Sequence, residues 1–350
     1  MANDSRMLIS PETIERVRRD NCFDSLRYLF AFSLILVHFC TLTETEQFWV
    51  ISGQTRVKAF FTITGFLVVY SYLRHDNLTT YVGKRLRRIM PAYVTVVLVC
   101  VAAGLCFTPV SPADYITDSQ TWHYLAANLT MLNFLEPSLP RLFPGHYEEA
   151  VNGSLWSMKF EMIFYALIPI IIWLMRRCGK LSVLTAVFAA YIAYRATFDY
   201  LEDHHPEVAL YSAVNHASFN TMAYFFSGMA IILYFDLFCR HIRIVVPLCI
   251  ALLLLLHCAD VYVLNYIEPL LFSALLVSVA YYCRPLNFLQ HHDNISYGLY
   301  LYHYPVIQVL IQAGLHRYNI WLTLALTVAI TIALAALSWR YIEKPILRRS

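Results

Sequence analysis

Long apolar segments recur along the whole chain and are separated by shorter polar stretches. A helix needs about 20 apolar residues to cross the hydrocarbon core of a bilayer, whereas the strands of an outer-membrane barrel alternate over about ten. The segment lengths therefore predict an all-α polytopic membrane protein with about ten transmembrane helices. We expect these spans near residues 25–42, 58–73, 92–108, 158–175, 181–198, 219–236, 243–262, 266–283, 295–314 and 319–342.

Composition agrees with this class. Hydrophobic residues make up 59% of the chain and charged residues 14%, against about 25% charged in an ordinary soluble domain. The net charge of +3 is accounted for by basic loops, so nothing favours binding to nucleic acid. The nine cysteines are scattered without CxxC or metal-ligand spacing, which predicts neither a disulfide framework nor a metal site.

Lysine and arginine fall on alternate loops, and the opposite loops are richer in acids. The positive-inside rule then places both termini in the cytoplasm, which agrees with an even number of spans. We expect a cytoplasmic segment over residues 1–24, a transmembrane domain over 25–342 and a cytoplasmic tail over 343–350. The long loop 109–157 faces outside in this topology, and loops of this length are usually functional.

Two ionisable residues lie in the first predicted span. Arg27 and His38 are eleven residues apart, or about 16 Å and three helical turns, so both can face one groove inside the bundle. Arg27 near the cytoplasmic edge can also merely snorkel, and a buried histidine can be structural. Because ionisable groups are costly inside a membrane, the pair is nevertheless the first candidate for chemistry.

A basic cluster precedes the third predicted span. Lys84, Arg85, Arg87 and Arg88 stand in a window of five residues before Pro91. The cluster can contact anionic lipid head groups. It can also bind phosphate, since arginine presents planar pairs of donors, and Arg85 and Arg88 share one face if the stretch is helical.

Two further polar groups enter the bundle. Glu161 follows Trp156 and Ser157 by about one turn on the fourth predicted span, where its carboxylate needs a partner. Trp156 alone is typical of the aromatic belt at a membrane interface. His303 lies about 13 Å along the ninth span, beside Tyr300, and a structural hydrogen-bonded histidine is the alternative to a functional one.

Five strings occur in a single order over nearly the whole chain: FDSLRYLFAFSLILVHF, FFTITGFLV, KRLRRIMPAY, LWSMKFEMIFY and SYGLYLYHYPV. Together they resemble the membrane acyltransferase-3 family, whose members O-acylate sugars of cell-surface glycans. The resemblance implies that Arg27 and His38 are a catalytic pair. Residues 84–88, through Lys84, Arg85 and Arg88, would contact an acyl-CoA donor. Glu161 and His303 would belong to the polar interior. If His38 is the catalytic base, Glu161 would take part in catalysis by orienting His38 or by stabilising its imidazolium.

One motif departs from the family pattern. The second span usually reads Ser-Gly-Phe and here begins with Thr64, which keeps a hydroxyl. The chain also ends soon after the tenth predicted span, so we expect it to lack the esterase-like C-terminal domain of some relatives.

The resemblance implies an enzyme that moves an acyl group, by expectation acetyl, from cytoplasmic acyl-CoA to a hydroxyl of a surface glycan or its lipid-linked precursor. We expect no bound cofactor and no metal, with acyl-CoA as donor substrate and a bacterial inner membrane as location. Aromatic and acidic residues in the outer loop are compatible with sugar binding: Trp122, His123, Tyr124, Phe134, His146, Tyr147, Glu148 and Glu149.

A different class remains open. A proton-coupled secondary transporter or glycan translocator also has intramembrane His, Arg and Glu residues. The halves of the chain show no internal repeat, and a carrier has no need of the basic cluster, so the acyltransferase is the preferred hypothesis.

Overall fold

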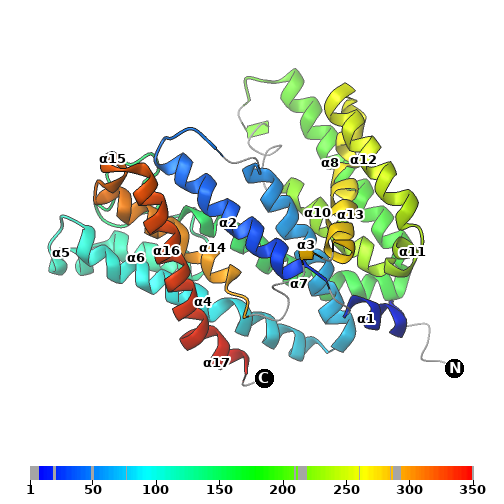
Figure 1. Cartoon of the computed structure of the whole chain (residues 1–350), viewed down its shortest axis with the longest axis horizontal. Helices are drawn as coiled ribbons and strands as arrows, with labels where there is room; N and C mark the ends of the chain where they lie inside the picture. Colours follow the sequence, from blue (N-terminus) through cyan, green and yellow to red (C-terminus); the bar gives the residue numbers. More distant parts are fainter. Residues whose placement is uncertain are drawn as a thin grey trace. The chain divides into compact units, whose positions relative to one another are not determined.

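The computed structural model describes residues 8–18, 21–48, 51–75, 77–208, 210–211, 219–259, 261–283, 285–286 and 293–348. This part of the chain is helical, with no strand (Figure 1). Of the predicted cytoplasmic ends, residues 1–7, 19–20 and 349–350 lie outside the described residues.

Each predicted span overlaps a helix in the part of the chain that the structure describes. The helices of the first half are α1 (Pro11–Val17), α2 (Phe23–Leu42), α3 (Gly53–His75), α4 (Leu78–Phe107), α5 (Pro112–Thr117), α6 (Ser119–Leu129), the 3₁₀ turn η2 (Gly153–Ser157) and α7 (Met158–Cys178). Those of the second half are α8 (Lys180–His204), α10 (Phe219–Leu233), α11 (Phe235–Arg240), α12 (Ile242–Ala259), η3 (Tyr262–Tyr266), α13 (Glu268–Tyr282), α14 (Ser296–Gln312), α15 (Leu315–Tyr318), α16 (Ile320–Ser338), η5 (Trp339–Glu343) and α17 (Lys344–Leu347).

Six helical segments of the described chain are long and apolar enough to cross a membrane. They are Phe23–Leu42, Leu78–Phe107, Gly153–Cys178, Lys180–His204, Ile242–Ala259 and Ile320–Leu347. Together with the all-helical fold, these segments support the prediction of an integral membrane protein.

The structure shows that the basic cluster lies on a helix, which the sequence left open. Helix α4 begins at Leu78 and continues through Pro91, so the cluster is helical. A proline interrupts the hydrogen-bond ladder of a helix, but membrane helices tolerate one where local adjustments satisfy the backbone. One turn later, the Thr95 hydroxyl donates to the Pro91 carbonyl at 2.8 Å, which is a common back-bond of threonine in helices. Arg85 and Arg88 therefore do share one helical face.

The chain divides into two compact units, which we describe separately. The first comprises residues 1–27, 54–81 and 164–292. Its helices α3 and α10 approach closely because each places a glycine against the other's backbone. A Cβ on Gly65 would lie 2.0 Å from the Phe225 carbonyl oxygen, and one on Gly228 would lie 2.2 Å from that of Thr62. Small residues at such crossings are typical of membrane helices.

Two ion pairs lie on apolar helices of the first unit. Lys58 contacts Glu268 at 3.1 Å, and the Tyr224 hydroxyl donates to the same carboxylate. On α8, Arg195 Nε lies 3.1 and 3.2 Å from the two carboxylate oxygens of Asp199. These pairs explain how the apolar helices carry charged side chains, since a paired charge costs less to bury.

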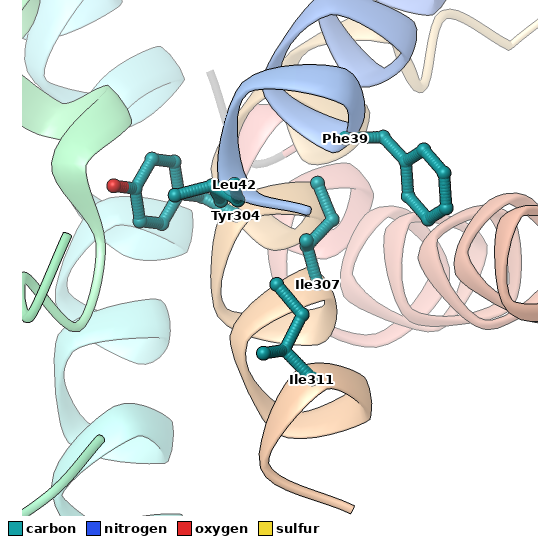
Figure 2. Packing of buried hydrophobic residues seen from close by; sticks show 5 residues of the cluster. All are labelled: Phe39, Leu42, Tyr304, Ile307 and Ile311. Atoms are coloured by element: carbon teal, nitrogen blue, oxygen red, sulfur yellow. The ribbon is translucent and has the colours of Figure 1, made fainter. Parts of the chain in front are cut away.

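The second unit comprises residues 28–53, 82–163 and 293–350. Its helices α14 and α16 pack tightly, with Gly298 so close that a Cβ would lie 2.8 Å from the Ala335 Cα. Figure 2 shows a buried apolar cluster where the end of α2 meets α14. The cluster comprises Phe39, Leu42, Tyr304, Ile307 and Ile311, and it fixes the end of α2 beside the middle of α14.

Candidate active site

His38 and His303 are in direct contact within the second unit. His38 Nδ1 lies 2.7 Å from His303 Nε2, and the two rings are parallel to within 9° with centroids 5.0 Å apart. His303 is completely buried, whereas His38 is partly exposed. His303 Nδ1 lies 3.0 Å from the Leu299 carbonyl oxygen one turn earlier on α14. Two residues 265 positions apart in the sequence thus form one hydrogen-bonded pair.

Tyr304 holds the pair from one side. Its ring meets that of His38 edge to face, with centroids 5.4 Å apart. In Figure 2 its hydroxyl points away from the apolar cluster. A Cβ on Gly153 would lie 2.8 Å from the Tyr304 hydroxyl, so only a glycine fits at that position without a shift. The ring therefore has little room to leave His38.

A segment of the long loop lies along α14, and we call residues 146–157 the strap. Gln308 is completely buried and donates from its amide nitrogen to the carbonyls of Glu148 at 2.6 Å and Ala150 at 2.8 Å. Because that nitrogen is committed to two acceptors, the Gln308 oxygen is the atom that accepts from His146 Nδ1 at 2.8 Å. One buried amide thus fixes one end of the strap.

The other end of the strap is bound to the turn of α14 before His303. Asn152 Nδ2 donates to the Leu301 carbonyl at 2.9 Å, and Ser154 shares its hydroxyl proton between Asn152 Oδ1 at 2.6 Å and the Tyr300 carbonyl at 3.3 Å. The Tyr300 hydroxyl donates to the Ser154 carbonyl. Since a phenol has one proton, Ser157 Oγ must be the donor in its 2.9 Å contact with the Tyr300 hydroxyl.

The other predicted residues of the fourth span lie at the end of the strap and in the first turn of α7. Trp156 packs edge to face with Phe160, with ring centroids 6.0 Å apart. Glu161 is partly exposed in the first turn of α7 and interacts electrostatically with Tyr297 and Tyr300 on α14. The structure therefore brings Ser157 and Glu161 to the same helix as His303.

Arg88 on α4 lies between two aromatic rings and a buried acid. Its guanidinium carbon is 5.9 Å from the Tyr297 ring centroid and 5.4 Å from that of Trp339. Its Nη1 lies 3.5 Å from an oxygen of Glu343, which is completely buried and also accepts from Ser338 at 3.3 Å. Glu343 belongs to η5, a π-helical turn, and such turns are frequent at functional sites.

The other predicted residues are placed as follows. Lys84 and Arg85 are partly exposed one turn before Arg88 on α4. Arg27 contacts Asp24 at 3.4 Å within the first unit. Thr64 is partly exposed on α3, also in the first unit.

Residues 20–340 match the model of the acyltransferase-3 family, which describes an acyltransferase domain. The chain belongs to this family. The acyltransferase is similar to nodulation protein 10 of Rhizobium leguminosarum bv. viciae, with 27% identity over 356 residues that cover 94% of this chain and 93% of that protein. It is also similar to the O-acetyl transferase of Shigella phage Sf6, with 24% identity over 345 residues that cover 95% and 98%.

A third relative, the O-acetyltransferase OatA of Staphylococcus aureus, is 24% identical over 184 residues, which cover 47% of this chain and 27% of that protein. No solved structure matches the acyltransferase. In the described part of the chain, no group of three or more His, Cys, Asp or Glu side chains is arranged to hold a metal ion.

Sequence reasoning missed several residues of the acyltransferase's polar interior. Gln308 and Glu343 are completely buried polar side chains in or beside apolar segments, and that burial cost was a signal available in the sequence. The sequence predicts His146 only as one of several loop residues compatible with sugar binding. Nothing in the sequence joined Arg88 to Trp339, because the contact depends on how α4 and the end of α16 meet.

Proposed function

We propose that the protein is an O-acyltransferase, and specifically an O-acetyltransferase, which moves an acyl group from acyl-CoA to a hydroxyl of a cell-surface glycan or its lipid-linked precursor. The observation that carries the proposal is the hydrogen-bonded pair of the partly exposed His38 and the completely buried His303. Membership of the acyltransferase-3 family and the similarity to proteins named O-acetyltransferases support it.

In this reaction His38 is the general base. It takes the proton of the acceptor hydroxyl while that oxygen bonds to the carbonyl carbon of the thioester. The carbon–sulfur bond then breaks, and the proton passes from His38 to the departing thiolate, which gives the ester and the free thiol of CoA. Positioned acid–base catalysis of this kind contributes about 10²- to 10⁴-fold to a rate.

The remaining site residues have supporting roles in the proposal. Arg85 and Arg88, with Lys84, bind the phosphates of the donor, since arginine pairs with phosphate oxygens through planar donors. Arg27 stabilises the oxyanion or a donor phosphate. Glu161 orients His38 or stabilises its imidazolium. The tyrosines of α14 lie beside the acceptor hydroxyl, together with Ser157 and Trp156.

The proposed topology separates donor and acceptor. With ten spans over 25–342 and both termini in the cytoplasm of a bacterium, the basic end of α4 meets cytoplasmic acyl-CoA. The loop 109–157, which includes the strap, then faces the outer side and the glycan. Acyl transfer across the inner membrane needs this separation.

The test uses membranes that contain the full chain and acetyl-CoA labelled in its acetyl group. Label is expected in the glycan fraction, and His38→Ala should reduce transfer at least about 100-fold at an unchanged protein level. His241→Ala is the matched control, because His241 lies on the surface of the first unit between α11 and α12. Proton-coupled uptake of a solute without transfer of label would favour the carrier and overturn the proposal.

A further inference from the structure

The two nitrogens of His303 have different partners, and these partners fix the position of its proton. Nδ1 lies 3.0 Å from the Leu299 carbonyl oxygen, which can only accept, so Nδ1 must carry the proton. His303 is completely buried, and burial disfavours a charged imidazolium. A neutral ring protonated at Nδ1 has its lone pair at Nε2.

That lone pair determines the tautomer of His38. His38 Nδ1 lies 2.7 Å from His303 Nε2, and since Nε2 accepts, His38 Nδ1 must donate. The short contact between nearly parallel rings whose centroids are 5.0 Å apart places them side by side in a common plane. The N–H of one ring then points along the lone pair of the other, as a hydrogen bond requires.

From this chain of hydrogen bonds we infer that His303 is a positioning residue that holds His38 as the tautomer protonated at Nδ1 and basic at Nε2. The chain runs from His38 through His303 to the Leu299 carbonyl. The inference rests on the proposed function, in which His38 is the base. It adds that Nε2 of His38 takes the proton and that the hydrogen bond to His303 selects this nitrogen.

The arrangement divides the work between the two rings. His38 is partly exposed and can meet a hydroxyl, whereas His303 is completely buried. When His38 takes the acceptor's proton at Nε2, its Nδ1–H becomes a stronger donor to His303 because the ring is charged. His303 thereby stabilises the imidazolium without entering the reaction, as an orienting group does for a catalytic histidine.

Two phenols face the pair. Tyr304 meets the edge of His38, and the Tyr300 ring centroid is 6.4 Å from that of His303. Tyr304 is also part of the apolar cluster that joins α2 to α14. The tautomer is therefore set by the same packing that aligns the two helices.

The first test replaces His303 in the full-length protein in membranes. His303→Phe keeps a planar ring but removes the acceptor, so kcat should fall at least about 100-fold at an unchanged KM. The acid limb of the pH profile should move to lower pH, because the imidazolium of His38 has lost its acceptor. His303→Gln offers an amide oxygen to His38 Nδ1 and should retain activity within about tenfold. His241→Phe is the matched control.

A second measurement does not depend on activity. Nitrogen-15 NMR of histidine-labelled wild-type protein, assigned with His38→Gln, should show His38 unprotonated at Nε2 and protonated at Nδ1 at neutral pH. The opposite tautomer would overturn the inference.

The outcomes separate this inference from the proposed function. A His303→Phe variant with wild-type kcat and pH profile, beside an inactive His38→Ala variant, would overturn only the role of His303. An active His38→Ala variant would overturn the proposed function itself.

Discussion

Tyr300 and Ser154 are joined by two hydrogen bonds that run in opposite directions. The Tyr300 phenol donates to the Ser154 carbonyl, and the Ser154 hydroxyl lies 3.3 Å from the Tyr300 carbonyl. The Ser157 hydroxyl makes a further hydrogen bond, to the Tyr300 phenol, at 2.9 Å. The strap is therefore attached to α14 one turn before His303, so its attachment and the geometry of the histidine pair are linked.

Tyr300→Phe should loosen this attachment. The change removes one donor and leaves the Ser154 carbonyl and the Ser157 hydroxyl without their partner, at a cost of about 1 to 3 kcal/mol. Thermal unfolding in detergent should show lower stability, and limited proteolysis should show faster cleavage within residues 137–157. Tyr318→Phe is the control, because Tyr318 is 85% exposed. Equal stability of both variants would contradict the prediction.

Gly153→Ala should disturb the site through Tyr304. The new methyl would lie 2.8 Å from the Tyr304 hydroxyl and force the ring to move, and overpacking of this kind costs about 1 to 3 kcal/mol. Because the ring meets the edge of His38, labelled-acetyl transfer should fall by a larger factor than the loss of folded protein explains. The methyl would also lie 2.8 Å from the Tyr304 ring carbon Cζ, so adding Tyr304→Phe, which removes only the hydroxyl oxygen, should not restore the activity.

The crossing of α3 and α10 depends on two glycines. Gly65→Ala and Gly228→Ala each place a methyl against backbone atoms that cannot rotate away, so each should lower the unfolding temperature and the yield of folded protein. Gly83→Ala is the matched control, because nothing lies within 4 Å of its Cβ position. Alanine is the better helix former by about 1 kcal/mol, so Gly83→Ala should be neutral or stabilising.

Arg88 and Glu343 should show strong coupling. Arg88→Gln leaves the completely buried Glu343 carboxylate without its countercharge, and breaking a buried pair in this way costs about 3 to 5 kcal/mol. The double variant Arg88→Gln/Glu343→Gln removes both charges and should recover much of that stability. A double-mutant cycle of unfolding free energies measures the coupling, and simple additivity would contradict it.

The start of α14 should lose one stabilising contact in acid. Lys344 lies 2.5 Å from Asp293, and its hydrogen bond lowers the pKa of that carboxyl below the ordinary value. A lowered pKa stabilises the folded state above the unfolded pKa of about 3.9, and the effect is lost as pH falls through the folded pKa. Wild type should therefore exceed Lys344→Met in unfolding temperature at pH 6, and the difference should shrink as pH falls below about 4 and vanish below the folded pKa.

The sequence alone predicted much of the fold. Apolar length and composition predicted the class of fold and a helix at each span, because the bilayer requires a long apolar helix wherever the chain crosses it. Single helical boundaries were less accurate, as α4 shows: the third span was expected to begin after Pro91, near residue 92, whereas the helix begins at Leu78.

For the candidate site, the sequence singled out His38 and His303 as ionisable residues in apolar surroundings, and Arg88 as part of a basic cluster. The resemblance of five strings predicted the family to which the chain belongs. Only the tertiary structure decided their partners, pairing His38 with His303 across 265 positions and Arg88 with Glu343 at a π-helical turn. Burial cost can be read from a residue and its neighbours in the chain, but a hydrogen bond requires two atoms within about 3 Å, and helix packing sets that distance.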